Sequence, residues 1–193
     1  FPSCTVMYPS SDKPQKETDL DMNSIGSPKY LGGAWMKIYA EMQCKFFASL
    51  GRTKFTIIRH SNMYGPCDRF DPERSHVFGA NIRKVAEATD GNVVVWGKGQ
   101  EVRDFLYIDD FTKFIELVID NQDYNFDLFN LGSEEPITID DLVKKVIRLS
   151  DKNLEIVYDP SGPTIGTKIS IDSTRARNKF GWKPQNSLDE GIK

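Results

Sequence analysis

The stretch from Lys54 to Val77 constrains the fold of this 193-residue chain most strongly, because it places a strand directly before a long polar loop. The run Phe55–Ile58 is rich in β-branched and aromatic side chains, as in strands buried on both faces of a sheet. Gly65 and Pro66 then end the strand, since proline lacks a ladder donor and glycine permits a sharp change of direction. In open α/β sheets ligands bind just beyond the carboxyl ends of strands, so this loop is a candidate ligand site, the alternative being an ordinary surface connection. Its candidate side chains are Asn62, Asp68, Arg69, Arg74 and His76.

Helical and strand-like patterns alternate along the whole chain, which predicts the α/β class. The expected helices span residues 28–50, 77–88, 109–119, 139–149 and 173–180, and the later strands span 93–96, 103–108, 128–131, 154–158 and 168–172. Asp109 and Asp110 are expected to cap the third of these helices, and Thr138 the fourth.

The predicted helix from Pro28 to Leu50 is the longest in the chain. Its expected apolar face carries residues at three- or four-residue spacing, beside a charged row at every fourth position. The apolar residues are Trp35, Ile38, Met42 and Phe46, and the charged residues are Lys37, Glu41 and Lys45.

Composition excludes several classes of protein. A formal net charge of -3 with no Lys/Arg run gives no basic field, so nucleic acid is not an expected partner. No apolar run approaches the roughly 20 residues of a membrane span, so no membrane partner is expected. The three cysteines are too few for a disulfide framework and form no C-x-x-C pair, so we expect a reducing, cytoplasmic location and no metal site.

Three groups of spaced residues follow one another in a fixed order. They are Arg59-x-x-Asn62-x-Tyr64-Gly65-Pro66, then Trp96-Gly97-x-Gly99-x-x-x-Arg103-Asp104-Phe105-x-Tyr107-x-Asp109-Asp110, and finally Gly181-Trp182-x-Pro184. Together they resemble the signatures of the extended short-chain dehydrogenase/reductase family, the NAD(P)-dependent nucleotide-sugar epimerases, dehydratases and reductases. Within it, the motifs around Tyr64, His76 and Trp96 are most similar to the epimerase-reductases that act on GDP-4-keto-6-deoxy sugars.

The resemblance implies a Rossmann-type parallel sheet with a small α/β substrate-binding domain. Residues 1–62 would be the remainder of the dinucleotide-binding domain, and residues 63–193 would be mainly the nucleotide-sugar domain, with some segments returning to the sheet. The Gly-rich phosphate loop that such a fold needs is not found, so we expect a fragment whose amino-terminal, Gly-rich half is absent.

The family's chemistry is hydride exchange between a nicotinamide and a sugar carbon, with a tyrosine and, four residues later, a lysine on one helix face. Lys37 matches that lysine, but Gly33 occupies the tyrosine position, and Tyr30 is too far from Lys37 for the usual pairing. By resemblance, Lys37 and His60 would contact NADP or NAD. The alternative for Lys37 is a solvated charge.

The resemblance also implies a Ser or Thr hydroxyl at the sugar oxygen, a position that Cys4 occupies, with Thr5 beside it. A thiol is a weak donor, so Cys4 would be a poor substitute. His76 matches the family's proton carrier, and histidine as a residue type suits acid/base chemistry at neutral pH; the alternative is a cap of the following helix.

By resemblance, the partner is a nucleotide-diphosphate sugar. Asn62 would contact its phosphate region, Lys84 and Arg103 its diphosphate, and Trp96 its nucleotide. A homodimer through the helix from Pro28 to Leu50 is also expected. Three alternatives stay open: a catalytically degenerate binding module, suggested by Gly33; a 4-epimerase or dehydratase of the same family; and pairing with a separately encoded Rossmann half.

Overall fold

A computed structural model describes residues 1–71 and 74–193, so Pro72 and Glu73 of the polar loop lie outside the described residues. The helices are α1 (Leu31–Ser49), α2 (Val77–Glu87), α3 (Ile108–Asn121), α4 (Ile139–Leu149), α5 (Thr174–Phe180) and α6 (Leu188–Ile192), with 3-10 turns η1 (Glu17–Asp19) and η2 (Pro28–Tyr30). The strands are β1 (Phe55–His60), β2 (Asn62–Tyr64), β3 (Asn92–Trp96), β4 (Val102–Arg103), β5 (Phe105–Tyr107), β6 (Phe126–Leu131), β7 (Ile137–Thr138) and β8 (Glu155–Asp159). Parallel pairing dominates, which confirms the predicted α/β class.

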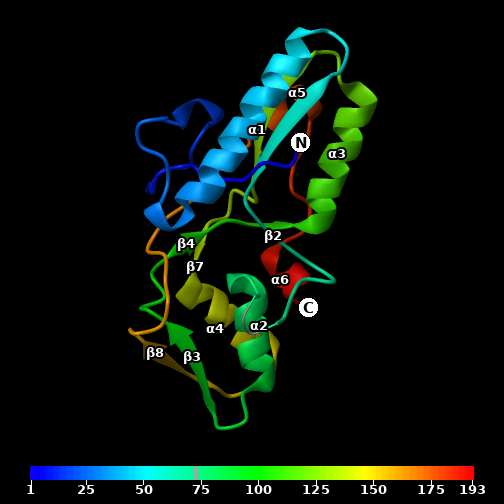
Figure 1. Ribbon diagram of the computed structural model, residues 1–193. Coiled ribbons are helices and arrows are strands. Elements are labelled where there is room, and N and C mark those ends of the chain that lie inside the picture. Colours follow the sequence, from blue (N-terminus) through cyan, green and yellow to red (C-terminus); the bar gives the residue numbers. More distant parts are fainter. Residues whose placement is uncertain (72–73) are drawn as a thin grey trace.

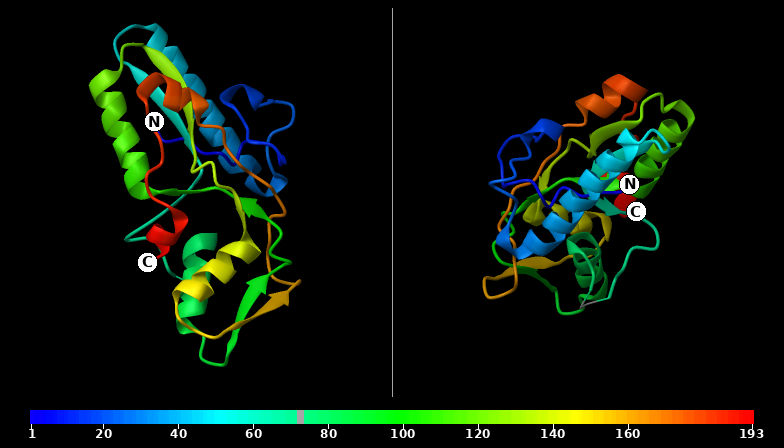
Figure 2. Two further views of the ribbon diagram at one scale, coloured as in Figure 1. Left: turned by 180° about the vertical axis from the view of Figure 1, so that it is seen from behind. Right: turned by 45° about the horizontal axis from the view of Figure 1, so that its top comes forward.

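Strands β1 and β6 form the centre of one part of the molecule, where they pair in parallel over six residues. Pro2 adds an isolated parallel bridge to Ile58 on β1. Helix α1 lies along one side of these strands and α3 and α5 lie on the other (Figures 1 and 2). Phe114, Phe129 and Trp182 are buried between the strands and the second pair of helices. Segments that are distant in the sequence, such as Phe55 of β1 and Phe126 of β6, thus share one core.

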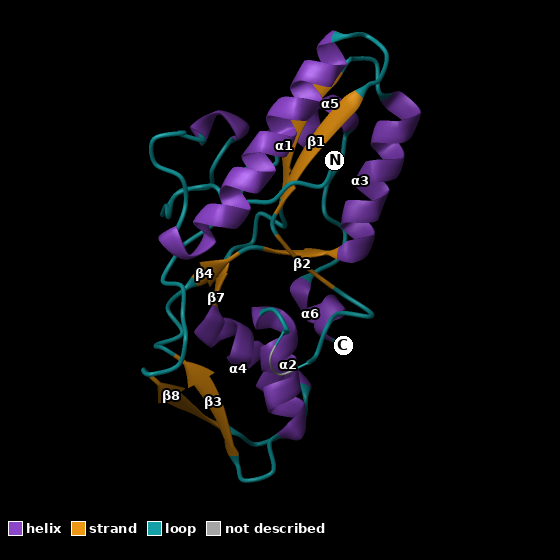
Figure 3. Cartoon of the chain, viewed as in Figure 1, coloured by secondary structure: helices purple, strands orange, loops and turns teal. Residues whose placement is uncertain are grey.

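The second part of the molecule is built from β3, β8, α2 and α4, at the opposite end of the elongated chain (Figure 3). β3 pairs with β8 in parallel, with Val93 opposite Ile156. The inward residues of β3 alternate with outward ones, so Val93 and Val95 are buried against α2 and α4. The short pairs β2–β5 and β4–β7 lie between the two parts, where the chain crosses from one to the other.

Helix α1 forms where the sequence predicts it, but the predicted apolar face is wrong. Trp35, Met42 and Phe46 are exposed, whereas Ala34, Ile38, Glu41 and Ala48 are buried. Glu41, from the expected charged row, can be buried because Arg59 of β1 pairs with it at 2.7 Å. None of the helices in the described ranges is both long and apolar enough to cross a membrane.

Three local predictions need correction. Tyr107, not Asp109 or Asp110, is the N-cap of α3, and Asp110 accepts backbone N–H bonds from Gln185 and Asn186, each at 3.0 Å. The buried Asp110 therefore anchors the carboxyl-terminal segment. The expected strand 103–108 is divided at Asp104 into β4 and β5, and residues 168–172 form isolated bridges only. The Thr138 cap is confirmed, since its hydroxyl accepts a bond of 3.0 Å from the Asp141 N–H.

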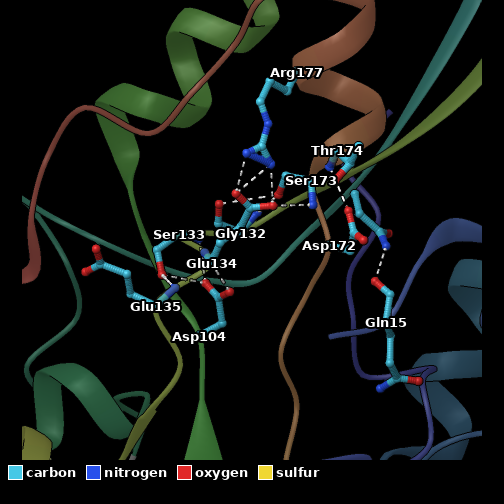
Figure 4. Close-up of polar contacts among 11 residues, drawn as sticks. Gln15, Asp104, Gly132, Ser133, Glu134, Glu135, Asp172, Ser173, Thr174 and Arg177 are labelled. Carbon is cyan, nitrogen blue, oxygen red and sulfur yellow. Dashed lines mark hydrogen bonds and ion pairs between the residues drawn. The ribbon is translucent and has the colours of Figure 1, made fainter. Parts of the chain in front are cut away.

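A buried carboxylate holds the crossing region together (Figure 4). Asp104 accepts hydrogen bonds from the backbone N–H and hydroxyl of Ser133 at 2.7 and 3.0 Å, and burial raises the pKa of its carboxyl. Glu134 has a left-handed φ of 61°, and its carboxylate pairs with Arg177 of α5 at 2.7 Å. These contacts fix the loop after β6 against the turn between β4 and β5.

Candidate functional site

A cavity of about 310 Å3 lies between α2, the end of β3 and the segment 163–165. Five of the residues expected to serve substrate or chemistry line it, namely Asn62, His76, Lys84, Trp96 and Arg103. The other lining residues are Tyr30, Ser75, Val77, Ala80, Asn81, Val95, Glu101, Ile139, Pro163, Thr164 and Ile165. We refer to this hollow as the candidate cavity.

Lys84 and Trp96 form one wall of the candidate cavity. Lys84 lies in the last turn of α2, and its ammonium nitrogen is 4.2 Å from the centroid of the Trp96 ring, a cation–π contact. The same nitrogen donates to the carbonyl of Val94 at 3.0 Å. Burial lowers the pKa of Lys84, with the charge of Asp159 acting in the opposite direction. A partly desolvated cation is therefore held against the aromatic ring.

Arg103 lies on β4, and its guanidinium donates to main-chain carbonyls of the segment beside the cavity. The acceptors are Ile165 at 2.9 Å and Thr167, in addition to Val102 at 2.8 Å. Burial lowers the pKa of Arg103, although the charges of Tyr30 and Glu101 act against this. Lys29 donates to the Thr164 carbonyl, so a second cation contacts the same segment.

A narrow recess of about 30 Å3 is lined by residues that also face the candidate cavity: Tyr30, Asn62 and Arg103. Asn62 is fixed by its Nδ2, which donates to the Asp104 carbonyl at 3.1 Å. Thr5 lines the recess as well, so one of the two candidate hydroxyl or thiol residues lies near the substrate-binding candidates.

Cys4, Gly33 and Lys37 are not among the residues that line either hollow. Cys4 packs against the apolar cluster under α1, and burial raises the pKa of its thiol. Lys37 Nζ donates to the Pro2 carbonyl at 2.8 Å and lies 5.0 Å from the centroid of the Phe1 ring. Lys37 is therefore held by the Pro2 carbonyl and the Phe1 ring, two contacts that a purely solvated charge would not make.

His60 lies at the end of β1, with Nδ1 2.8 Å from the Ser61 carbonyl and its ring edge-on to Phe111. Burial lowers the pKa of His60, and the nearby charge of Lys37 acts in the same direction. Lys37 and His60 are thus close enough to interact, and neither of them lines the candidate cavity.

His76 occupies the N-cap position of α2, but its side chain makes no capping hydrogen bond, so the expected cap alternative is wrong. Its side chain instead lines the candidate cavity. The hydroxyl of Ser75, beside it, is buried with no hydrogen-bond partner among the residues that the structure describes, and it belongs to the same lining. A polar rim therefore surrounds the start of α2.

Sequence reasoning assigned no site role to Glu101, Tyr30 or Ser75. Glu101 was detectable in principle, because it is two positions before Arg103 in an extended segment and so faces the same side. A larger, more open hollow of about 480 Å3 near η1 and α5 contains none of the expected residues, and we do not assign the site to it. Among residues 1–71 and 74–193, no group of three His, Cys, Asp or Glu could hold a metal ion.

This fold, with a polar cavity beside the end of β3, is of the α/β class, in which ligands commonly bind beyond the carboxyl ends of parallel strands. The NAD dependent epimerase/dehydratase family matches residues 1–132, and the chain belongs to that family. The resemblance found in the motifs is thereby confirmed.

Among curated relatives, the chain is similar to probable GDP-L-fucose synthase 1 of Oryza sativa subsp. japonica, with 36% identity over 135 residues, covering 68% of this chain and 40% of the relative. It is also similar to GDP-L-fucose synthase of Escherichia coli (strain K12), with 28% identity over 204 residues, covering 100% of this chain and 63% of the relative. The chain thus spans between 40% and 63% of the length of these two relatives.

Among solved structures, the chain is similar to UDP-glucose 4-epimerase of Thermotoga maritima, whose structure contains UDP-glucose. The TM-score is 0.82 at 30% identity, and the match covers 100% of this chain and 60% of that chain.

Proposed function

We propose that this chain forms the nucleotide-sugar-binding part of an NAD(P)-dependent epimerase/reductase similar to GDP-L-fucose synthase. Its substrate would be a GDP-4-keto-6-deoxy sugar or a related nucleotide-diphosphate sugar. The observation that carries the proposal is that Asn62, Lys84, Trp96 and Arg103 line one cavity although they come from four separate elements or loops. Relatives named GDP-L-fucose synthase support the substrate class.

In this proposal Lys84 and Arg103 neutralise the diphosphate. Two cations suit a dianionic group, and the planar guanidinium adds directional donors. The aromatic face of Trp96 packs against the nucleotide, while Asn62, whose position Asp104 fixes, orients the phosphate region. Because both cations now donate to carbonyls, ligand binding exchanges or shares those hydrogen bonds.

The reaction would use Thr5 as a donor to the sugar oxygen and His76 as a proton carrier, since both line the hollows that contain Asn62 or Arg103. NADP or NAD would supply or accept the hydride. The Lys37 ammonium and the half-buried His60 lie near each other, and together they would hold the nicotinamide-ribose end of such a cofactor. Dimerisation through α1 would cover its exposed apolar side chains.

The second candidate function is a catalytically degenerate binding module that keeps the nucleotide-sugar cavity without redox chemistry. Gly33 favours it, because the family's acid/base tyrosine is replaced by a residue without a side chain. A Cβ added at Gly33 would meet no described atom within 4 Å, so a side chain can begin at this position without a clash. A 4-epimerase or dehydratase of the same family is a further alternative for the reaction itself.

Binding of GDP to the purified chain, measured by isothermal titration calorimetry, tests the proposed substrate class. We expect saturable 1:1 binding that Lys84→Met weakens about tenfold, because a charge-assisted contact is lost. Lys113→Met, on the exposed side of α3, is the matched control and should leave binding unchanged. No saturable binding, or equal loss in both variants, would refute the cavity assignment.

Redox activity separates the two candidate functions. The chain, preceded by a segment that supplies a Gly-rich dinucleotide loop, is mixed with NADPH and a GDP-4-keto-6-deoxy sugar, and absorbance at the nicotinamide band is followed. Turnover with Gly33 in place excludes the degenerate module. Turnover that appears only after Gly33→Tyr supports the degenerate binding module.

A further inference from the structure

Glu101 lies on the wall of the candidate cavity, and its carboxylate faces the Gly97 turn that follows Trp96. Glu101 and Arg103 are two residues apart in an extended segment, and both side chains line the cavity. One Glu101 carboxylate oxygen is 3.4 Å from the point that a Cβ on Gly97 would occupy, which places the carboxylate against the turn that follows Trp96. The Glu101 carbonyl accepts a bond of 3.0 Å from the Ile139 N–H, so the backbone beneath the side chain is fixed.

Within the part of the chain that the structure describes, no hydrogen-bond donor or ion-pair partner faces the Glu101 carboxylate. Its charge acts through space on Arg103, whose guanidinium is already bonded to three carbonyls. A half-buried carboxylate on a hydrogen-bonded backbone, with no donor facing it among the described residues, is an acceptor available to a ligand.

Charge decides which part of a nucleotide can approach Glu101. A diphosphate is repelled by the carboxylate and attracted to Lys84 and Arg103, so the uncharged part of the nucleotide faces Glu101. Trp96, between Lys84 and the Gly97 turn, offers an aromatic surface to a base at this end.

An ionised carboxylate accepts hydrogen bonds and donates none, and it binds best to two donors side by side. Guanine presents such a pair, the N1–H and the N2 amino group. Uracil presents one N–H between two carbonyl oxygens, which a carboxylate repels, and cytosine and adenine place one amino donor beside a ring acceptor.

We propose that Glu101 is a specificity-determining residue that selects guanine over uracil in the nucleotide-diphosphate ligand. This inference rests on the proposed function, because it assigns the base of the ligand that the candidate cavity holds. Two charge-assisted hydrogen bonds to the base give the chain a preference for GDP over UDP of roughly 10- to 100-fold.

Calorimetric titration of the chain with GDP, UDP and 2′-deoxy-GDP tests the assignment. We expect Glu101→Gln to reduce the preference for GDP over UDP about tenfold, mainly by weakening GDP binding, since the amide replaces one acceptor by a donor. Glu101→Ala should remove the preference, with UDP binding equal to or tighter than before. Glu116→Gln, on the exposed side of α3, is the control and should keep the preference.

The outcomes distinguish this inference from the proposed function. Equal affinity of the unchanged chain for GDP and UDP, or a GDP preference that survives Glu101→Ala, overturns the role of Glu101 while leaving the cavity assignment intact. A loss of affinity for 2′-deoxy-GDP that disappears in Glu101→Ala also overturns it, because the carboxylate would then bind the ribose. Absence of binding by all three nucleotides refutes the proposed function itself.

Discussion

Replacing Glu41 by glutamine tests the buried ion pair that joins α1 to β1. Arg59 Nε and Nη2 donate to the Glu41 carboxylate at 3.0 and 2.7 Å, and the Ser3 hydroxyl donates to it at 2.5 Å. The two side chains are only 8% and 6% exposed. Glu41→Gln keeps the shape of the side chain but removes the charge, leaving the Arg59 guanidinium buried without a counter-ion.

The expected loss follows from that unpaired charge. Removing one partner of a buried pair costs about 3–5 kcal/mol, a large share of the roughly 5–15 kcal/mol that stabilises a typical domain. For a chain of this size the melting temperature should fall by roughly 6–20 °C. Urea unfolding followed by tryptophan fluorescence, together with a thermal melt, measures both quantities.

A double variant, Glu41→Leu with Arg59→Met, provides the check. Because it removes both charges, its loss of unfolding free energy should be smaller than the sum of the losses caused by Glu41→Leu alone and Arg59→Met alone. A loss below about 1 kcal/mol for Glu41→Gln would show that the arginine is compensated without its carboxylate, and the reasoning would fail. Glu116→Gln, at an exposed position of α3, should leave the midpoint unchanged.

Three further predictions concern a cap, a histidine and an exposed face. Thr138→Ala should destabilise the chain by about 1 kcal/mol in urea unfolding, because the Asp141 N–H loses its acceptor; an unchanged midpoint would contradict the cap. The folded-state pKa of His60 is lowered below 6.5, so the stability that neutral His60 contributes is present above pH 6.5 and is lost as pH falls through the folded pKa. Thermal melts between pH 7.5 and 5 should show a falling melting temperature, and His60→Gln should make this fall smaller. Equal dependence of the melting temperature on pH in both proteins would refute the prediction. Met42→Glu with Phe46→Glu should shift sedimentation toward the monomer, since both side chains are exposed on α1; an unchanged sedimentation coefficient would argue against association through this helix.

Local patterns predicted those elements whose determinants are adjacent in the chain. The Thr138 cap and the position of α1 depend on neighbouring residues, and the structure agrees with both. The face that α1 buries depends on Arg59 of another element, whereas periodicity alone placed Glu41 in a charged row beside the apolar face. The spacing of apolar residues predicts that a helix is amphipathic, but it does not predict which face of the helix packs against the rest of the protein.

The candidate site shows the same division. Motifs indicated Lys84, Trp96 and Arg103, and the structure places all three on one cavity, although their roles stay predictions. Glu101 could be inferred from its spacing to Arg103, but Tyr30 joins the cavity lining beside the Thr164 region, which is distant in sequence, and no short motif contains that information. The division into residues 1–62 and 63–193 also stays a prediction, and β6 pairs with β1 across that boundary.

The carbonyl contacts of the segment 163–167 have a thermodynamic consequence for any anionic ligand. Lys29 and Arg103 bind the main-chain oxygens of Thr164, Ile165 and Thr167, so a phosphate that recruits the Arg103 guanidinium competes with an intramolecular acceptor. The measured dissociation constant therefore includes the free energy of releasing these oxygens. Ligand binding therefore makes residues 163–167 more mobile, and greater mobility of this segment in turn favours ligand binding. Faster amide hydrogen exchange in residues 163–167 at saturating ligand would show this linkage.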